Sequence, residues 1–138
     1  MKIYFAGSIS GGRDDVKIYS EIINYLKKYG EVLTEHVGDA HLSAEDGEGI
    51  GDKKIHDRDM KWVLSSDILV AEITKPSLGV GYEIGRAFEN GKKILCLYRK
   101  EDGKMVSPMI IGNDKIKSFC YSDLEEAKEV IDGFSSTL

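Results

Sequence analysis

Residues 67–73 form the apolar run DILVAEI, and such a run predicts a parallel β-strand that is covered on both faces. The segment that follows, residues 74–82, contains two glycines and leads to Glu83, which is expected near the start of a helix. Ligands of open parallel sheets bind beyond the carboxyl ends of the strands, so this segment is expected to carry function. Its glycines would let the backbone approach a ligand, and Ser77 with the free N–H groups of the helix would bind an anion. A plainer interpretation also stays open, in which Glu83 only complements the helix dipole.

Strands and helices alternate along the rest of the chain. Further strands are predicted at residues 2–6, 31–35, 93–98 and 117–121, and helices at 14–29, 53–65, 83–90 and from 123 onward. Gly30 is a candidate C-terminal cap, and residues 36–52 are expected to form a long loop. This alternation predicts the α/β class with a doubly wound, five-stranded parallel sheet in the flavodoxin-like (Rossmann-like) order 2-1-3-4-5. In that order the crevice lies where residues 7–13 and 74–81 meet.

The composition is that of one globular domain spanning residues 1–138. A formal net charge of −5 argues against a partner that is a nucleic-acid polymer, because affinity for the phosphate backbone depends on clustered Lys and Arg. No apolar run approaches the roughly 18 residues of a membrane span. With no signal-peptide pattern before the first strand, the expected location is cytoplasmic, or nuclear in a eukaryote.

The cysteines and histidines show no spacing that is typical of a metal site or a redox motif. Cys96 and Cys120 lie in predicted strands, where both are expected to be buried thiols and neither a nucleophile. The three histidines lack the spacing of zinc ligands. A structural metal is therefore not expected.

Two loops with glycines and serines that face each other suggest a site for a phosphate or a sugar. Response regulators are disfavoured because the first strand ends in Phe5, Ala6 and Gly7 and not in acidic residues. The Thr-rich loop of flavodoxins, the Walker lysine and a GxGxxG motif after the first strand are also missing.

Six short segments, in order and across nearly the whole chain, carry a resemblance to a known family. They are YFAGSI at 4–9, GGR at 11–13, LTEHV at 33–37, DRDM at 57–60, PSLGVGYE at 76–83 and VSPMI at 106–110. In these six segments, their order and their spacing, the chain resembles the 2′-deoxynucleoside 5′-phosphate N-hydrolases, a branch of the nucleoside 2-deoxyribosyltransferase superfamily. The resemblance implies hydrolysis of the N-glycosidic bond of a deoxynucleoside monophosphate, without a cofactor.

The resemblance also implies roles for individual residues. Glu83 would be the nucleophile, Asp59 the acid/base partner, and Tyr4 the hydroxyl that orients the nucleophile. Residues expected to bind the substrate are Gly7, Ser8, Ile9, Ser10, Gly11, Arg13, His36, Ser77, Gly79, Ser107 and Met109. Ser77, Gly79 and Ser107 would hold the 5′-phosphate, and the protein is expected to be a homodimer in which Ser107 serves the neighbouring site.

Plainer interpretations stay open for several of these residues. Asp59 could be a solvated acid, although helical spacing puts it on one face with Trp62. His36 could be no more than a strand-end residue, and Tyr4 could belong to the core. Where the family tends to carry arginine, this chain has Ser10, which removes a forked contact to phosphate that Arg13 could replace.

Pro108 is a second departure, because a small residue such as alanine is usual after the family's serine. It should stiffen the loop and leave the hydroxyl of Ser107 in place.

Two other functions also fit the sequence. The chain could be a transferase, in which a second base captures the sugar, or a nucleotide-binding module without turnover.

Overall fold

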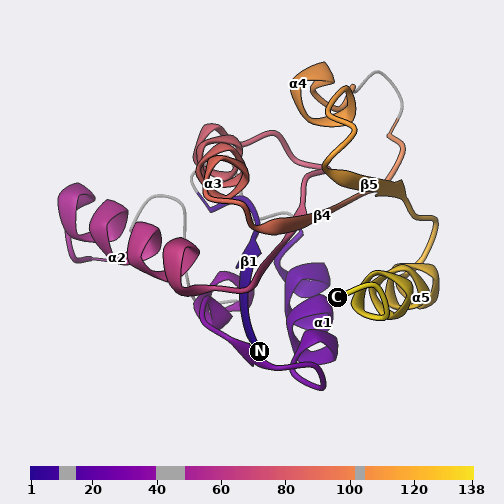
Figure 1. Ribbon diagram of the computed structural model, residues 1–138, viewed down its shortest axis with the longest axis horizontal. Helices are drawn as coiled ribbons and strands as arrows, with labels where there is room; N and C mark the ends of the chain where they lie inside the picture. Colours follow the sequence, from indigo (N-terminus) through magenta and orange to yellow (C-terminus); the bar gives the residue numbers. More distant parts are fainter. Residues whose placement is uncertain (10–14, 40–48, 102–104) are drawn as a thin grey trace.

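A computed structural model describes residues 1–9, 15–39, 49–101 and 105–138 of the chain. Its strands are β1 (Lys2–Ala6), β2 (Glu31–Val32), β3 (Ile68–Glu72), β4 (Lys93–Tyr98) and β5 (Lys117–Cys120). Its helices are α1 (Val16–Leu26), α2 (Asp52–Ser65), α3 (Leu78–Glu89), α4 (Pro108–Ile111), α5 (Leu124–Ser135) and the 3₁₀ turn η1 (Glu35–Gly38). All strand pairs are parallel and the order is β2-β1-β3-β4-β5, so the predicted fold class and strand order are confirmed (Figure 1).

Helices cover both faces of the sheet, with α2 and α3 on one face and α1 and α5 on the other (Figure 1). Alternate residues of β1 serve the two layers, as the period of a strand requires. Ile3 and Phe5 pack with α1 and α5, whereas Tyr4 and Ala6 pack with α2 and α3. The side chain of Tyr4 therefore points into the layer that also contains Asp59 and Glu83.

The second strand is shorter than predicted, because pairing ends at Val32 and the expected strand 31–35 continues as a turn. Thr34 explains the end of the strand. Its hydroxyl accepts from the backbone N–H of Phe5 at 2.9 Å and donates to the carbonyl of Phe5 at 2.7 Å, replacing main-chain pairing. The chain then turns through η1, so His36 lies in a 3₁₀ turn and not at a strand end. Of the expected loop 36–52, residues 40–48 lie outside the described ranges.

The first helix ends earlier than predicted, at Leu26 with Lys27 as its C-cap, so Gly30 is not the cap. Asp14, its predicted first residue, lies outside the described ranges. Close backbone approach explains the glycine at position 30. A Cβ there would lie 2.1 Å from the carbonyl oxygen of Met1, which no side chain could tolerate.

The third helix begins five residues earlier than predicted, at Leu78, and not at Glu83. Ser77 is its N-cap and accepts from the N–H of Val80 at 3.3 Å. Gly79 and Gly81 therefore lie in the first turns of the helix and not in the loop before it. The buried stripe of Val80, Ile84 and Ala87 compensates for two poor helix formers.

A short helix that the sequence did not predict, α4, follows Ser107. Ser107 caps it by accepting from the N–H of Met109 at 3.2 Å, and Pro108 takes the first helical position, where its missing N–H costs nothing. The last helix begins at Leu124 after its N-cap Asp123, close to the predicted start.

The two cysteines differ in environment. Cys96 is buried in β4 and burial raises the pKa of its thiol to about 12, whereas Cys120 is exposed, so the prediction that both are buried is wrong for Cys120. The reason is that β5 is the edge strand and is largely exposed. Within the described ranges, no helix combines the length and the apolar character that crossing a bilayer requires. The cytoplasmic location stays a prediction.

Candidate active site

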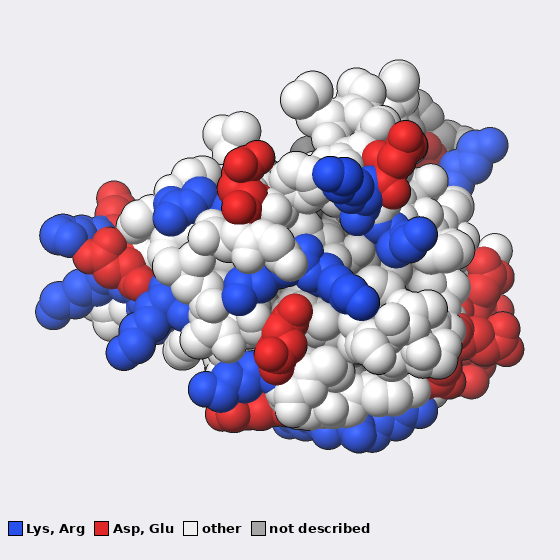
Figure 2. All heavy atoms as spheres, in the orientation of Figure 1, with Lys and Arg blue, Asp and Glu red and all other residues white. Residues whose placement is uncertain are grey.

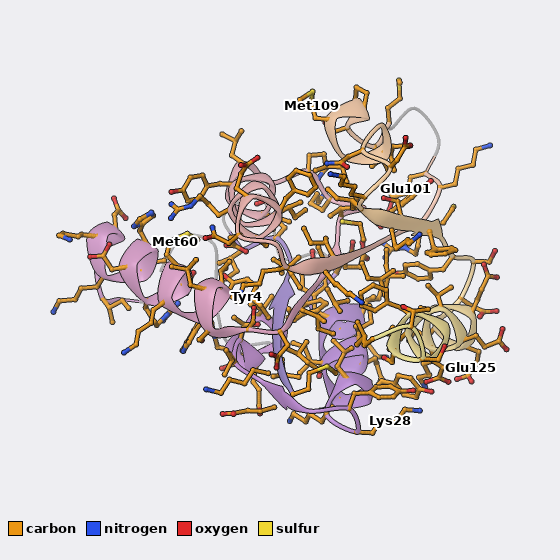
Figure 3. The ribbon with its side chains drawn as sticks, in the orientation of Figure 1. Tyr4, Lys28, Met60, Glu101, Met109 and Glu125 are labelled. Atoms are coloured by element: carbon orange, nitrogen blue, oxygen red, sulfur yellow. The ribbon has the colours of Figure 1, made fainter. Side chains whose placement is uncertain are left out.

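Tyr4, Asp59 and Glu83 form a cluster at the point where the connections from β1 and β3 diverge. They come from β1, α2 and α3, and Tyr4, labelled in Figure 3, is almost fully buried. Burial raises the pKa of Tyr4 above its ordinary value, and the charges of Glu83 and Asp59 and a hydrogen bond to Glu83 raise it further. The phenol therefore stays protonated and donates to Glu83. The structure thus brings these three residues together, and their catalytic roles stay a prediction.

Arg58 connects Asp59 to two aromatic side chains, His36 and Trp62. Its Nε and Nη2 atoms donate to Oδ1 of Asp59 at 3.0 and 2.9 Å, and Nη2 lies 3.4 Å from Nε2 of His36. The guanidinium carbon stands 4.7 Å from the ring centre of Trp62, close enough for a cation–π contact. His36 and Trp62 lie side by side with ring centres 5.8 Å apart. The side chain of Asp59 is only 15% exposed, so Asp59 is not a solvated surface acid.

The start of the first loop is held by α1. The N–H of Ser8 donates to the hydroxyl of Tyr19 at 3.1 Å. A Cβ at Gly7 would lie 3.0 Å from the Tyr19 ring, so a larger residue would press against this ring where the chain crosses it. Ile9 packs at the edge of the same layer. The other predicted loop residues, Ser10, Gly11 and Arg13, lie outside the described ranges.

A cavity of about 800 Å³ lies between the start of α3 and the segment 105–110. Ser77, Gly79, Ser107 and Met109, all predicted to bind substrate, line it together. Its described lining includes Tyr82 and stops short of the Tyr4 cluster. The predicted residues thus fall into two groups, one around the carboxylates and one around this cavity.

No group of three or more His, Cys, Asp or Glu side chains in the described part of the chain is arranged to hold a metal ion. The expectation that neither a metal nor a cofactor is needed stays a prediction.

A second polar network lies on the other face of the sheet and was not predicted. Glu72, whose side chain is fully buried, accepts from Nη1 of Arg99 at 2.6 Å and from the hydroxyl of Tyr121 at 3.0 Å. Arg99 also donates through Nη2 to Asp15 at 2.8 Å. Burial lowers the pKa of Arg99, but hydrogen bonds to Asp15 and Tyr121 and the charge of Glu72 outweigh it and raise that pKa overall. The network ties β3, β4 and the start of α1 together.

The sequence contains a partial signal for the contacts of each of these two arginines. Arg58 and Trp62 are four residues apart on one helix, the spacing at which side chains meet. Glu72 is an acid within an apolar strand, and a buried acid requires a partner. Arg99, 27 residues further on, could not be identified as that partner from spacing alone.

Together, the fold and the cluster define the class: an α/β protein with a flavodoxin-like sheet that carries two carboxylates and a phenol at its switch point. The family model described as nucleoside 2-deoxyribosyltransferase matches residues 3–128. The chain therefore belongs to the nucleoside 2-deoxyribosyltransferase family, as its motifs predict.

Similar proteins support a narrower placement within this family. A protein of Danio rerio named 5-hydroxymethyl-dUMP N-hydrolase is 49% identical, covering 100% of this chain and 98% of its own. A Nematostella vectensis protein is 55% identical over 91% of this chain and 86% of its own, and its name marks it as a candidate 2′-deoxynucleoside 5′-phosphate N-hydrolase. Among solved structures, the Clostridium botulinum CMP N-glycosidase BcmB has a TM-score of 0.67 at 20% identity, covering 96% of this chain and 99% of BcmB. That last likeness shows a shared fold.

Proposed function

We propose that this protein hydrolyses the N-glycosidic bond of 2′-deoxynucleoside 5′-monophosphates, releasing the free base and 2-deoxyribose 5-phosphate. The observation that carries the proposal is the convergence of Tyr4, Asp59 and Glu83 at the switch point of the sheet. Two carboxylates flanking a glycosidic bond are the usual means of stabilising an oxocarbenium-like transition state. Relatives at about half identity whose names describe this activity support the same conclusion.

The chemistry follows from the arrangement of these side chains. An oxygen of Glu83, oriented by the Tyr4 hydroxyl, attacks C1′ opposite the base, and the C1′–N bond breaks with its electron pair leaving on the base. Asp59 is ionised at this stage, so the base leaves as an anion and takes up its proton only after the water has reacted. A water molecule then attacks C1′ of the glycosyl ester, Asp59 accepts its proton, and the bond to Glu83 breaks to restore the carboxylate. The base takes up the proton, so one water is consumed in each turnover.

The 5′-phosphate would bind at the cavity beside α3. The first-turn N–H groups of α3 and the hydroxyl of Ser77 are suited to an anion, and Gly79 keeps that turn free of side chains. Binding energy from a phosphate that takes no part in the reaction can position C1′ against Glu83. His36, beside Arg58 and Trp62, would contact the base and the sugar.

Product analysis with a set of nucleotides tests the function. We expect deoxynucleoside monophosphates, including 5-hydroxymethyl-dUMP, to yield free base and deoxyribose 5-phosphate, and the corresponding nucleosides to react far more slowly. Adding a second base distinguishes the transferase, because a new nucleotide would then form. Binding of a nucleotide without release of base would indicate the non-catalytic module.

Replacing Ser77 with alanine should narrow the preference for monophosphates over nucleosides by about 10-fold, because a hydrogen bond to a charged phosphate is lost. The kcat/KM values for one monophosphate and its nucleoside measure this. Ser77 also caps α3, so a matched control is Asp123→Ala, which removes the cap of α5. The control should lose similar stability and keep the preference, whereas an unchanged preference in Ser77→Ala would contradict phosphate binding at this serine.

We also propose that the protein is a homodimer in which Ser107 completes the neighbouring site. Apolar side chains around the cavity are unusually exposed, with Leu78, Met105 and Met109 at 97, 88 and 81%. The surface over α4 is formed by uncharged residues (Figure 2). In Figure 3, Met109 lies well apart from Tyr4, the phenol of the catalytic cluster in its own chain. A partner chain would cover the exposed side chains and carry Ser107 to a second cluster.

Mixing two impaired variants tests the shared site. Glu83→Ala and Ser107→Ala dimers, combined in equal amounts and allowed to exchange subunits, should regain about a quarter of wild-type activity, because half the dimers are mixed and each has one intact site. The competing arrangement is that Ser107 serves the cavity of its own chain, where it lies with Ser77. Activity no higher than that of the parents, after exchange is verified, would establish that arrangement. Repeating the mixture with Ser107→Gly controls for the lost helix cap, since glycine is tolerated there.

A further inference from the structure

Arg58 and Asp59 are neighbours in sequence on α2, and adjacent side chains of a helix normally point about 100° apart. Their contact therefore requires that the arginine side chain bend around the helix toward Asp59. Trp62, one turn later, provides the surface that holds it, with the guanidinium carbon 4.7 Å from the centre of its ring. Both donors of the guanidinium fork, Nε at 3.0 Å and Nη2 at 2.9 Å, then meet a single oxygen of Asp59.

The titratable and charged groups of this region come from four elements. Tyr4 reaches it from β1, His36 from η1, Glu83 from α3, and Arg58 and Asp59 from α2. Two neighbouring carboxylates oppose each other's ionisation, and a cation in contact favours it. The exposed fractions of Arg58 and Asp59, 26 and 15%, are low enough that water screens their attraction only in part. A nucleophilic Glu83 needs its own negative charge, so the cluster needs compensation for a second carboxylate.

We infer that Arg58 is a positioning residue for the reaction, which holds the carboxylate of Asp59 in place and keeps it ionised next to Glu83. The inference rests on the proposed function, in which Asp59 accepts the proton of the attacking water. An ionised carboxylate is the form that can accept it. Through Nη2, the same guanidinium links Asp59 to His36 on the side proposed for the base.

The pH dependence of kcat/KM for a deoxynucleoside monophosphate tests this role. In Arg58→Gln, the acid limb should move to higher pH by about one unit, because the two carboxylates lose the cation that favours their ionised forms. At pH values below the acid limbs of both proteins, kcat/KM of Arg58→Gln should therefore be tenfold lower than that of the wild type. Arg58→Lys keeps the charge and loses the fork, so its acid limb should stay in place while kcat falls at every pH.

The exposed Lys61 on the same helix gives a matched control, since Lys61→Gln removes one positive charge without touching Asp59 and should reproduce the wild-type profile. An acid limb that does not move in Arg58→Gln would overturn the inference, as would an equal movement in Arg58→Lys. NMR titration of the Asp59 carboxyl carbon, without substrate, reads its ionisation directly, and the midpoint should rise in Arg58→Gln. This measurement separates the inference from the proposed function, because it stands even for a protein that turns over no nucleotide.

Discussion

Replacing Glu83 with alanine should reduce hydrolysis of a deoxynucleoside monophosphate by about 10³-fold or more, because the reaction loses its nucleophile. The fold should be unaffected. Glu83 is half-buried beside Asp59 and accepts a hydrogen bond from Tyr4, so its removal takes away one of two neighbouring negative charges. Release of base, followed with saturating substrate, measures the loss, and thermal unfolding measures the fold.

Two further variants make this result specific. Glu83→Gln keeps the size of the side chain and an oxygen that accepts from Tyr4, so an equal loss of activity assigns the effect to the carboxylate. Glu89→Gln, at the exposed end of the same helix, removes a charge away from the cluster and should keep full activity. Near-normal hydrolysis by Glu83→Ala would rule out a covalent glycosyl-glutamate intermediate.

Elements with a strong pattern were predictable from the sequence, and boundaries decided by side chains were not. The apolar run of β3 and the alternation of strands and helices were sufficient to predict the parallel sheet and its order. The start of α3 was misplaced because glycines suggest a loop, whereas the cap at Ser77 and a buried stripe extend the helix over Gly79 and Gly81. The second strand ends early because the Thr34 hydroxyl takes both backbone groups of Phe5, a contact across 29 residues.

The acidic residues of the candidate site were predictable from the sequence, whereas the contacts of its arginine were not. Motifs placed Tyr4, Asp59 and Glu83 at one edge of the sheet, and the structure brings them together. The contact between Arg58 and Asp59 was not predicted, because neighbours on a helix are expected to diverge, and here Arg58 also lies over the ring of Trp62. Periodicity and motifs carry little information about such contacts.

Arg99→Met should lower the free energy of unfolding by roughly 3–5 kcal/mol, which is typical of breaking a buried ion pair by removing one partner. The loss is this large because Glu72 would stay in a fully buried position without its cation. Hydrogen bonds from Tyr121 and from the N–H of Thr74 would still reach it, but they do not replace a positive charge. Asp15 at the start of α1 would lose the same contact. Chemical denaturation of the wild type and the variant measures the difference.

A double variant distinguishes two causes of the lost stability, an unpaired buried charge and lost packing. In Glu72→Gln with Arg99→Met, no buried charge is left at position 72, so the double variant should be more stable than Arg99→Met alone. Lys53→Met is the matched control, because it breaks an exposed pair with Asp57 and should leave the unfolding transition unchanged. If Arg99→Met unfolded like the wild type, the network around Glu72 would contribute little to stability. A double variant no more stable than Arg99→Met would attribute the loss to packing, because neutralising the buried carboxylate would then bring no gain.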